Sequence, residues 1–164
     1  MSESRVYVGT YGKYNNGSIA GAWLDLDDYT DKDDFYEACA ELHNDENDPE
    51  FMFQDYEGIP DGMISESHIN DATWEWLALD DYDRDKVEFM VNDCGYDPAD
   101  AIANVDDCEF YEGMNLEELA EHFVDEGLFG DIADSIINYI DYDAMARDLG
   151  MDYTETDKGV FRCP

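Results

Sequence analysis

The excess of acidic side chains constrains this chain more than any other feature of its sequence. Its 164 residues include 44 Asp and Glu but only 8 Lys and Arg, so the formal net charge is −36. Such a charge keeps a chain disordered unless enough apolar surface can be buried. Because 44% of the residues are hydrophobic and 14% are aromatic, a core is available. We therefore expect a folded protein with an acidic surface.

The acids are spread along the whole chain, whereas an acidic interaction tail would collect them at one end. The N-terminus lacks a basic region followed by an apolar run, and no segment holds about 18 uninterrupted apolar residues. An anionic membrane surface would also repel the protein. We expect a cytoplasmic protein without a membrane partner.

The residue patterns predict an α+β fold that consists of three small modules. The first, residues 1–61, is expected to hold strands at 5–10, 18–24 and 50–56, a hairpin turn at 15–17, and a helix capped by Thr30 or Asp31. Glycines and a proline at residues 58–62 mark its end. The second module, residues 62–103, is predicted to be helical, with helices capped by Ser67, Asp83 and Asp97.

The third module, residues 104–164, is predicted to mix strands and helices. A strand is expected at 105–111, a helix at 116–126, further helices capped by Asp131 and Asp141, and an antiparallel pair at 153–155 and 160–163.

The helix expected at residues 116–126 shows where the charge lies relative to the core. Its apolar stripe consists of Leu116, Leu119, Ala120, Phe123 and Val124. On the opposite face, Glu117, Glu121 and Asp125 form a row with steps of about 6 Å. Like charges at this spacing cost about 0.2–0.5 kcal/mol per pair, and no Lys or Arg compensates. A local rule broken without compensation indicates a function.

Clusters of acids without interleaved cations are the candidate binding residues, in which carboxylates would stand in for phosphates. They are Asp25, Asp27, Asp28, Asp31, Asp33 and Asp34; Asp80, Asp81, Asp83 and Asp85; and Glu117, Glu118, Glu121, Asp125 and Glu126. Duplex DNA carries about one charge per 1.7 Å of axis, so a charge of −36 equals roughly 60 Å of duplex. A compact domain of this size is about 30–40 Å across, which favours an elongated row of modules.

Proteins that track a duplex offer a groove lined with Lys and Arg, and a rigid acidic surface would fit it. The charge therefore predicts a mimic of duplex DNA. Binding of nucleic acid itself is excluded, because the chain has no basic patch. A mimic directed at another DNA-binding protein, such as a nucleoid protein, a repressor or a nuclease, is the alternative.

Other classes of function fit the sequence less well. An acidic binding module adapted to high salt stays open on composition alone. A calcium loop starting at Asp81 fails, because Lys86 and Asn92 stand where Gly and the bidentate Glu are needed. No catalytic motif, phosphate loop or zinc spacing is present, so we expect no enzyme, cofactor or metal. His43, His68 and His122 are expected to be buried or boundary residues.

Several stretches of the chain resemble the ArdA antirestriction proteins. They are RVYVGTYGKYNNGSIAGAWLDL (residues 5–26), LEELAEHFVDEGLFG (116–130), YIDYDAMARDLGMDY (139–153) and GVFR (159–162). The resemblance implies an elongated homodimer, carried on mobile elements that move by conjugative transfer. It further implies a mimic of bent DNA that occupies the DNA groove of type I restriction-modification enzymes in the recipient bacterium. Restriction, and with it modification, would be blocked.

Overall fold

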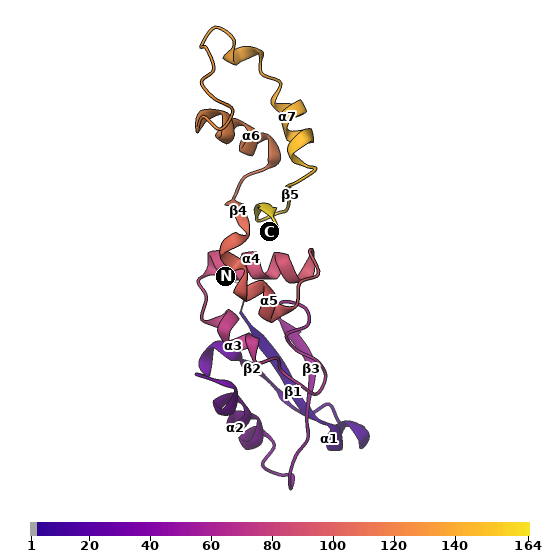
Figure 1. Cartoon of the computed structure of the whole chain (residues 1–164). Helices are drawn as coiled ribbons and strands as arrows, with labels where there is room; N and C mark the ends of the chain where they lie inside the picture. Colours follow the sequence, from indigo (N-terminus) through magenta and orange to yellow (C-terminus); the bar gives the residue numbers. More distant parts are fainter. Residues whose placement is uncertain (1–2) are drawn as a thin grey trace. The chain divides into compact units, whose positions relative to one another are not determined.

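The computed structural model describes residues 3–164, which divide into two compact units. Unit 1 ends at Val105, and unit 2 begins at Asp106. Together they show the expected α+β class, with helices and antiparallel sheets (Figure 1). A further division of residues 1–103 after Asp61 stays a prediction, and residues 1–2 of the predicted first module lie outside the described residues.

Unit 1 contains a three-stranded antiparallel sheet in the order β2-β1-β3. The strands are β1 (Arg5–Thr10), β2 (Ala22–Asp25) and β3 (Phe51–Glu57). The central strand β1 buries Val6 and Val8 completely. The strand predicted at 18–24 is observed only from Ala22 onward. At 15–17 the chain leaves a short helix, where a hairpin turn was predicted. The Thr10 hydroxyl accepts a hydrogen bond from the Lys13 N–H and so starts the short helix α1 (Tyr11–Asn15), which delays β2.

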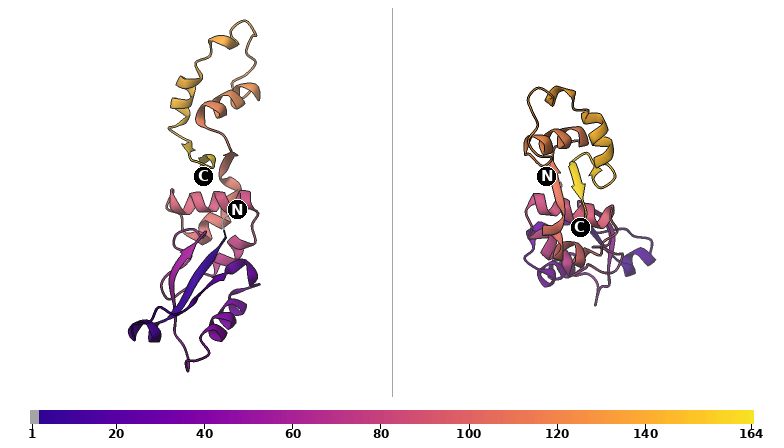
Figure 2. Two further views of the ribbon diagram at one scale, coloured as in Figure 1. Left: turned by 180° about the vertical axis from the view of Figure 1, so that it is seen from behind. Right: turned by 45° about the horizontal axis from the view of Figure 1, so that its top comes forward.

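Helix α2 (Lys32–Leu42) packs alongside this sheet, as Figures 1 and 2 show. Its start at the Asp31 cap confirms the prediction, because the Asp31 carboxylate accepts from the Asp34 N–H at 2.8 Å. The fully buried Phe35 lies with its ring centroid 6.1 Å from that of Phe53 on β3. An aromatic contact therefore joins the helix to the sheet.

After β3, unit 1 has turns and an isolated Ile64–Ile69 bridge, and then the further α-helices that were predicted for this region. These helices are α3 (Ala72–Leu77), α4 (Asp81–Asn92) and α5 (Pro98–Ala103). The expected caps at Ser67 and Asp83 are wrong. Residues 65–68 form a turn closed by the Ser65 N–H on the His68 carbonyl, so α3 starts later. Asp80, not Asp83, caps α4, whereas Asp97 caps α5 as expected.

Unit 2 contains a second antiparallel sheet, in the order β4-β6-β5, and two α-helices among its described residues. They are β4 (Glu109–Glu112), β5 (Thr154–Glu155), β6 (Gly159–Arg162), α6 (Leu116–Asp125) and α7 (Tyr142–Leu149). Leu119 and Phe123 of α6 bury themselves against Val160 of β6, which confirms the predicted stripe. Both units also contain short 3-10 helices, at Leu26–Asp28, Val105–Asp107 and Ile137–Tyr139. Because residues 105–107 form one of them, β4 starts at Glu109 and not at residue 105 as predicted.

The helix expected after Asp131 is wrong. Gly127 and Gly130 have positive φ angles, of 79° and 88°, and turn the chain away from the axis of α6. Beyond them, within residues 126–141, the structure has only the short 3-10 helix. Ile136 is 55% exposed and Tyr139 is 84% exposed. The isoleucine spacing suits a helix, but Ile136 is exposed and Ile132, Ile137 and Ile140 are only half-buried, so no fully buried face holds such a helix.

Many helices begin at an aspartate whose carboxylate accepts a backbone N–H. These N-caps are Asp25, Asp31, Asp80, Asp97 and Asp141. An N-cap of this kind stabilises a helix by about 1 kcal/mol. Part of the acidity therefore has a local structural cause. Separately, none of the helices in residues 3–164 combines the length and the apolar character that a bilayer span requires.

Candidate functional site

The predicted acidic clusters all lie at the surface of their own units. None of the fifteen carboxylates is buried, and the half-buried ones are Asp25, Asp34, Asp83 and Asp85. The remaining members are exposed. The residues are therefore accessible, whereas their part in binding stays a prediction.

The cluster at residues 25–34 combines exposed charge with local hydrogen bonds. The Asp25 carboxylate accepts from the Asp27 N–H at 3.0 Å, and the Asp34 carboxylate accepts from the Thr30 N–H at 3.1 Å. These bonds fix the directions of the carboxylates, so less side-chain freedom would be lost on binding a partner.

Helix α2 continues this cluster with a row that the sequence analysis did not single out. Asp33, Glu37 and Glu41 are exposed at positions i, i+4 and i+8 of the helix. Their spacing along the axis is about 6 Å per step, the same as in the row on α6. The i, i+4, i+8 pattern in the sequence is the signal that could have identified Glu37 and Glu41.

The cluster at residues 80–85 is less purely anionic than its sequence indicates. Asp83 lies 3.7 Å from the ammonium of Lys86, a residue that is only 7% exposed. From the first cluster, Asp27 lies 3.4 Å from the guanidinium of Arg84. Two of the predicted phosphate mimics are thus partly neutralised within unit 1.

Helix α6 presents the most uniform anionic face of the three clusters. Its carboxylates at Glu117, Glu118, Glu121, Asp125 and Glu126 are all exposed. Among the described residues none of them forms an ion pair, although Glu118 also closes the capping box with Asn115. Because the opposite face is anchored by Leu119 and Phe123, the row cannot rotate away from solvent.

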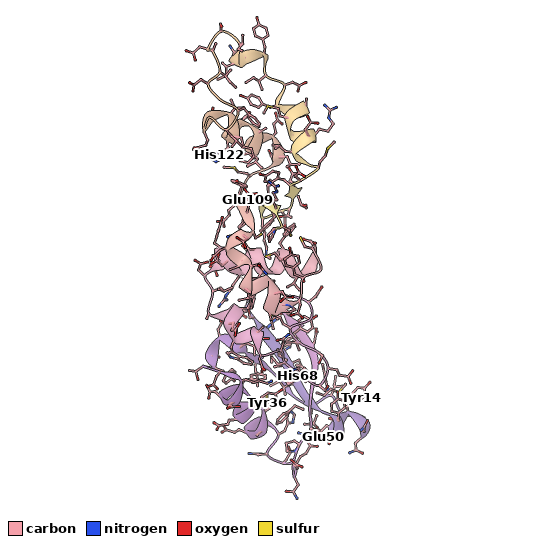
Figure 3. All side chains as sticks on the ribbon, viewed as in Figure 1. Tyr14, Tyr36, Glu50, His68, Glu109 and His122 are labelled. Carbon is pink, nitrogen blue, oxygen red and sulfur yellow. The ribbon has the colours of Figure 1, made fainter. Side chains whose placement is uncertain are left out.

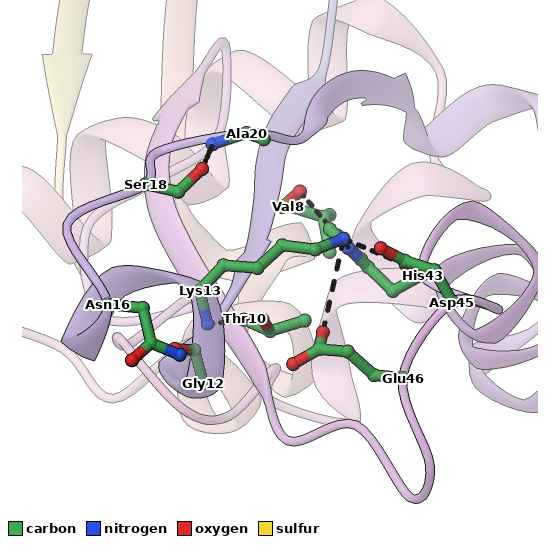
Figure 4. A network of polar contacts seen from close by, with 10 residues as sticks. All are labelled: Val8, Thr10, Gly12, Lys13, Asn16, Ser18, Ala20, His43, Asp45 and Glu46. Atoms are coloured by element: carbon green, nitrogen blue, oxygen red, sulfur yellow. Dashed lines mark hydrogen bonds and ion pairs between the residues drawn. The ribbon is translucent and has the colours of Figure 1, made fainter.

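A polar network around the buried His43 fixes helix α1 to the loop after α2 (Figure 4). The Lys13 ammonium lies 2.7 Å from His43 Nδ1 and 3.0 Å from Asp45 Oδ1. His43 is 1% exposed, and its Nε2 lies 3.0 Å from the Val8 carbonyl oxygen. This geometry fits a neutral imidazole that donates from Nε2 and accepts the lysine at Nδ1. The hydrogen bond from Lys13 lowers the pKa of Asp45.

The same loop contains the one group of possible metal ligands found in the described residues. It consists of His43, Asp45 and Glu46. The Lys13 ammonium also lies 4.0 Å from a Glu46 oxygen, so a cation of the protein itself sits among these ligands. The other histidines, labelled in Figure 3, are half-buried at His122 and exposed at His68, which corrects the expectation for His68.

Beside the edge strand β3 lies an open hollow of about 400 Å³. Its lining includes Tyr14, Met52, Gln54, Asp55, Tyr56 and Glu66. The Phe53 N–H donates to the Glu66 carbonyl at 2.7 Å, which holds one rim against the strand. At Gln54 the pairing of β3 with β1 shifts register, and such bulges often adjoin binding sites. No pattern in the sequence indicates this hollow, because its walls come from three separate segments.

One comparison with known proteins agrees with the resemblance of the sequence. A family model described as "Antirestriction protein (ArdA)" matches residues 6–162, which is nearly the whole chain. A search of curated proteins gave no match. The match covers both units and includes the row on α6. The chain therefore belongs to the ArdA family of antirestriction proteins.

Proposed function

We propose that the protein performs its antirestriction role as a mimic of duplex DNA in the cytoplasm, where it occupies the DNA groove of a type I restriction-modification enzyme. The observation that carries this proposal is the pair of carboxylate rows, Asp33, Glu37 and Glu41 on α2 and Glu117, Glu121 and Asp125 on α6. Both rows are exposed, and neither contains a cation. Their fixed spacing on helices is what separates them from an acidic tail.

The mechanism is competitive occupancy without turnover. The lysines and arginines of the enzyme groove would contact carboxylates instead of phosphates. Because the carboxylates are held by caps and buried stripes, little conformational entropy is lost on binding. Many contacts of this kind each contribute little, so single substitutions should have small effects and whole rows large ones.

The proposal includes a homodimer formed through unit 2. Leu128, Phe129, Ile136 and Tyr139 are all more than half exposed in that unit. They lie close together in the sequence, within residues 128–139, and a contiguous patch of exposed apolar side chains is typical of a surface that another chain covers. A second copy, together with an elongated arrangement of modules, would extend the anionic surface over roughly twice the 60 Å of duplex that one net charge of −36 represents.

A competition gel shift tests the proposed target. The protein is added to a complex between a purified type I enzyme and a duplex with its recognition site. We expect release of the duplex, less effectively as salt rises, since exposed charges are screened. Unchanged enzyme–DNA complexes at a large excess of the protein would contradict the proposal. Displacement of DNA from a nucleoid protein instead would favour the alternative target.

A further inference from the structure

We propose that the hollow beside β3 receives an arginine side chain of the partner enzyme. The inference rests on the proposed function for the identity of the partner, but the chemistry of the hollow stands separately. The hollow would thus be a specific anchor within a surface that otherwise acts through many similar charges.

The walls of the hollow suit a flat cation. Tyr14, which is 52% exposed, lies on α1 (labelled in Figure 3), and Tyr56 lies on β3; both residues line the hollow. The faces of tyrosine rings attract guanidinium groups, which also stack on them. The Tyr56 hydroxyl donates to Asp61, and burial together with Asp61 raises the pKa of Tyr56.

The charge at the rim has the sign that an arginine needs. Asp55 and Glu66 both line the hollow and are exposed, and no lysine or arginine is among the described residues that line it. Carboxylates can accept two parallel hydrogen bonds from a guanidinium, which a lysine ammonium does not match. Met52 adds a polarisable apolar wall for the methylene stem.

The rim is held in place from two sides. On one side, the Lys13 network anchors α1, the helix that carries Tyr14. On the other, the Phe53 N–H holds the segment of Glu66. Because the walls are fixed before binding, an arginine would not have to order them. A general acidic surface gives no such selection of one side chain.

Titration of the full-length protein with N-acetyl-arginine amide tests the proposal, with ¹H–¹⁵N NMR spectra as the readout. We expect saturable shifts at Tyr14, Asp55 and Glu66, and almost none with N-acetyl-citrulline amide, which is neutral and similar in shape. The variant Asp55→Asn/Glu66→Gln should weaken the arginine probe about fivefold to tenfold. The matched variant Asp33→Asn/Glu37→Gln removes two charges from α2 and should leave the probe within about twofold.

Replacement of Tyr14 distinguishes the contribution of its ring to arginine binding from that of the carboxylates. Tyr14→Ala should weaken the probe, and Tyr14→Phe should restore it, because the ring face is kept. Shifts spread evenly over all acidic surfaces, or an equal response to N-acetyl-lysine amide, would overturn the proposal. If Asp55→Asn/Glu66→Gln still displaces DNA from the type I enzyme as well as the unmodified protein does, the anchor is refuted while the DNA mimic stands.

Discussion

Unit 1 and unit 2 carry the same kind of acidic surface on cores of different size. In unit 1, Phe35 contacts the rings of Phe53 and Trp74, and the buried His43 contacts the half-buried Lys13. In unit 2, the described core cluster is Leu119, Phe123 and Val160. Unit 2 also contains five of the eight large hydrophobic side chains that are exposed in the described chain. A helix can thus present an acidic face on a small core as well as on a large one. Burial of exposed apolar side chains by a second chain would stabilise unit 2 more than unit 1.

The largest loss of stability is expected when a large core side chain of each unit is truncated. Phe123→Ala should cost about 3–5 kcal/mol, enough to unfold the small core of unit 2. Phe35→Ala should cost a similar amount, but spread over the larger core of unit 1. Hydrogen–deuterium exchange by mass spectrometry reads the two units separately. If Phe123→Ala made both units exchange together, the comparison between independent cores would fail.

A smaller effect is expected from reversing the two charged rows. Glu117→Lys/Glu121→Lys/Asp125→Lys should raise the concentration needed to displace DNA by about 10-fold to 100-fold at low salt. The equivalent change on α2, Asp33→Lys/Glu37→Lys/Glu41→Lys, tests whether unit 1 contributes equally. Circular dichroism controls for folding. Full displacement by both variants would show that neither row contacts the enzyme.

The helix caps should give an effect of about 1 kcal/mol in either unit. Asn115→Ala removes the side chain that accepts the Glu118 N–H, and Asp31→Ala removes the one that accepts the Asp34 N–H. Urea unfolding measures both losses. The conservative changes Asn115→Asp and Asp31→Asn keep an acceptor oxygen and should restore most of the stability. A full loss in these conservative variants would mean that charge, not capping, matters there.

The smallest change in stability is expected when two ion pairs of unit 1 are lost at low pH. The hydrogen bond from Lys13 lowers the pKa of Asp45, and that from Lys32 lowers the pKa of Asp71. Their stabilisation is therefore present above the ordinary aspartate value of about 3.9 and is lost as the pH falls through the lowered folded values. Asp45→Asn/Asp71→Asn should reduce stability at pH 7 but not at pH 2, by urea unfolding. Asp33→Asn/Glu37→Gln, which breaks neither pair, should lack this difference.

The sequence predicted secondary structure correctly where a local pattern of residues determines it. Helix α6 follows from its apolar stripe and its cap, and β1 and α2 follow from alternation and from Asp31. The helix predicted after Asp131 was wrong, because the spacing of the isoleucines predicts a helix but does not show whether the folded unit can bury that face. The hollow beside β3 could not be predicted, since α1, β3 and the segment of Glu66 meet only in the folded unit. Exposure of the carboxylates on α6 followed from the same periodicity that predicted its buried stripe.

The aspartate caps tie the charge of this protein to its architecture. Asp25, Asp31, Asp80, Asp97 and Asp141 each add a negative charge and each start a helix. A homologue could lose charge at these positions through asparagine and keep its helices, whereas most other replacements would fray them. Selection for order alone would therefore keep a capping side chain at these positions but not its charge, even in a descendant that no longer had an enzyme to inhibit.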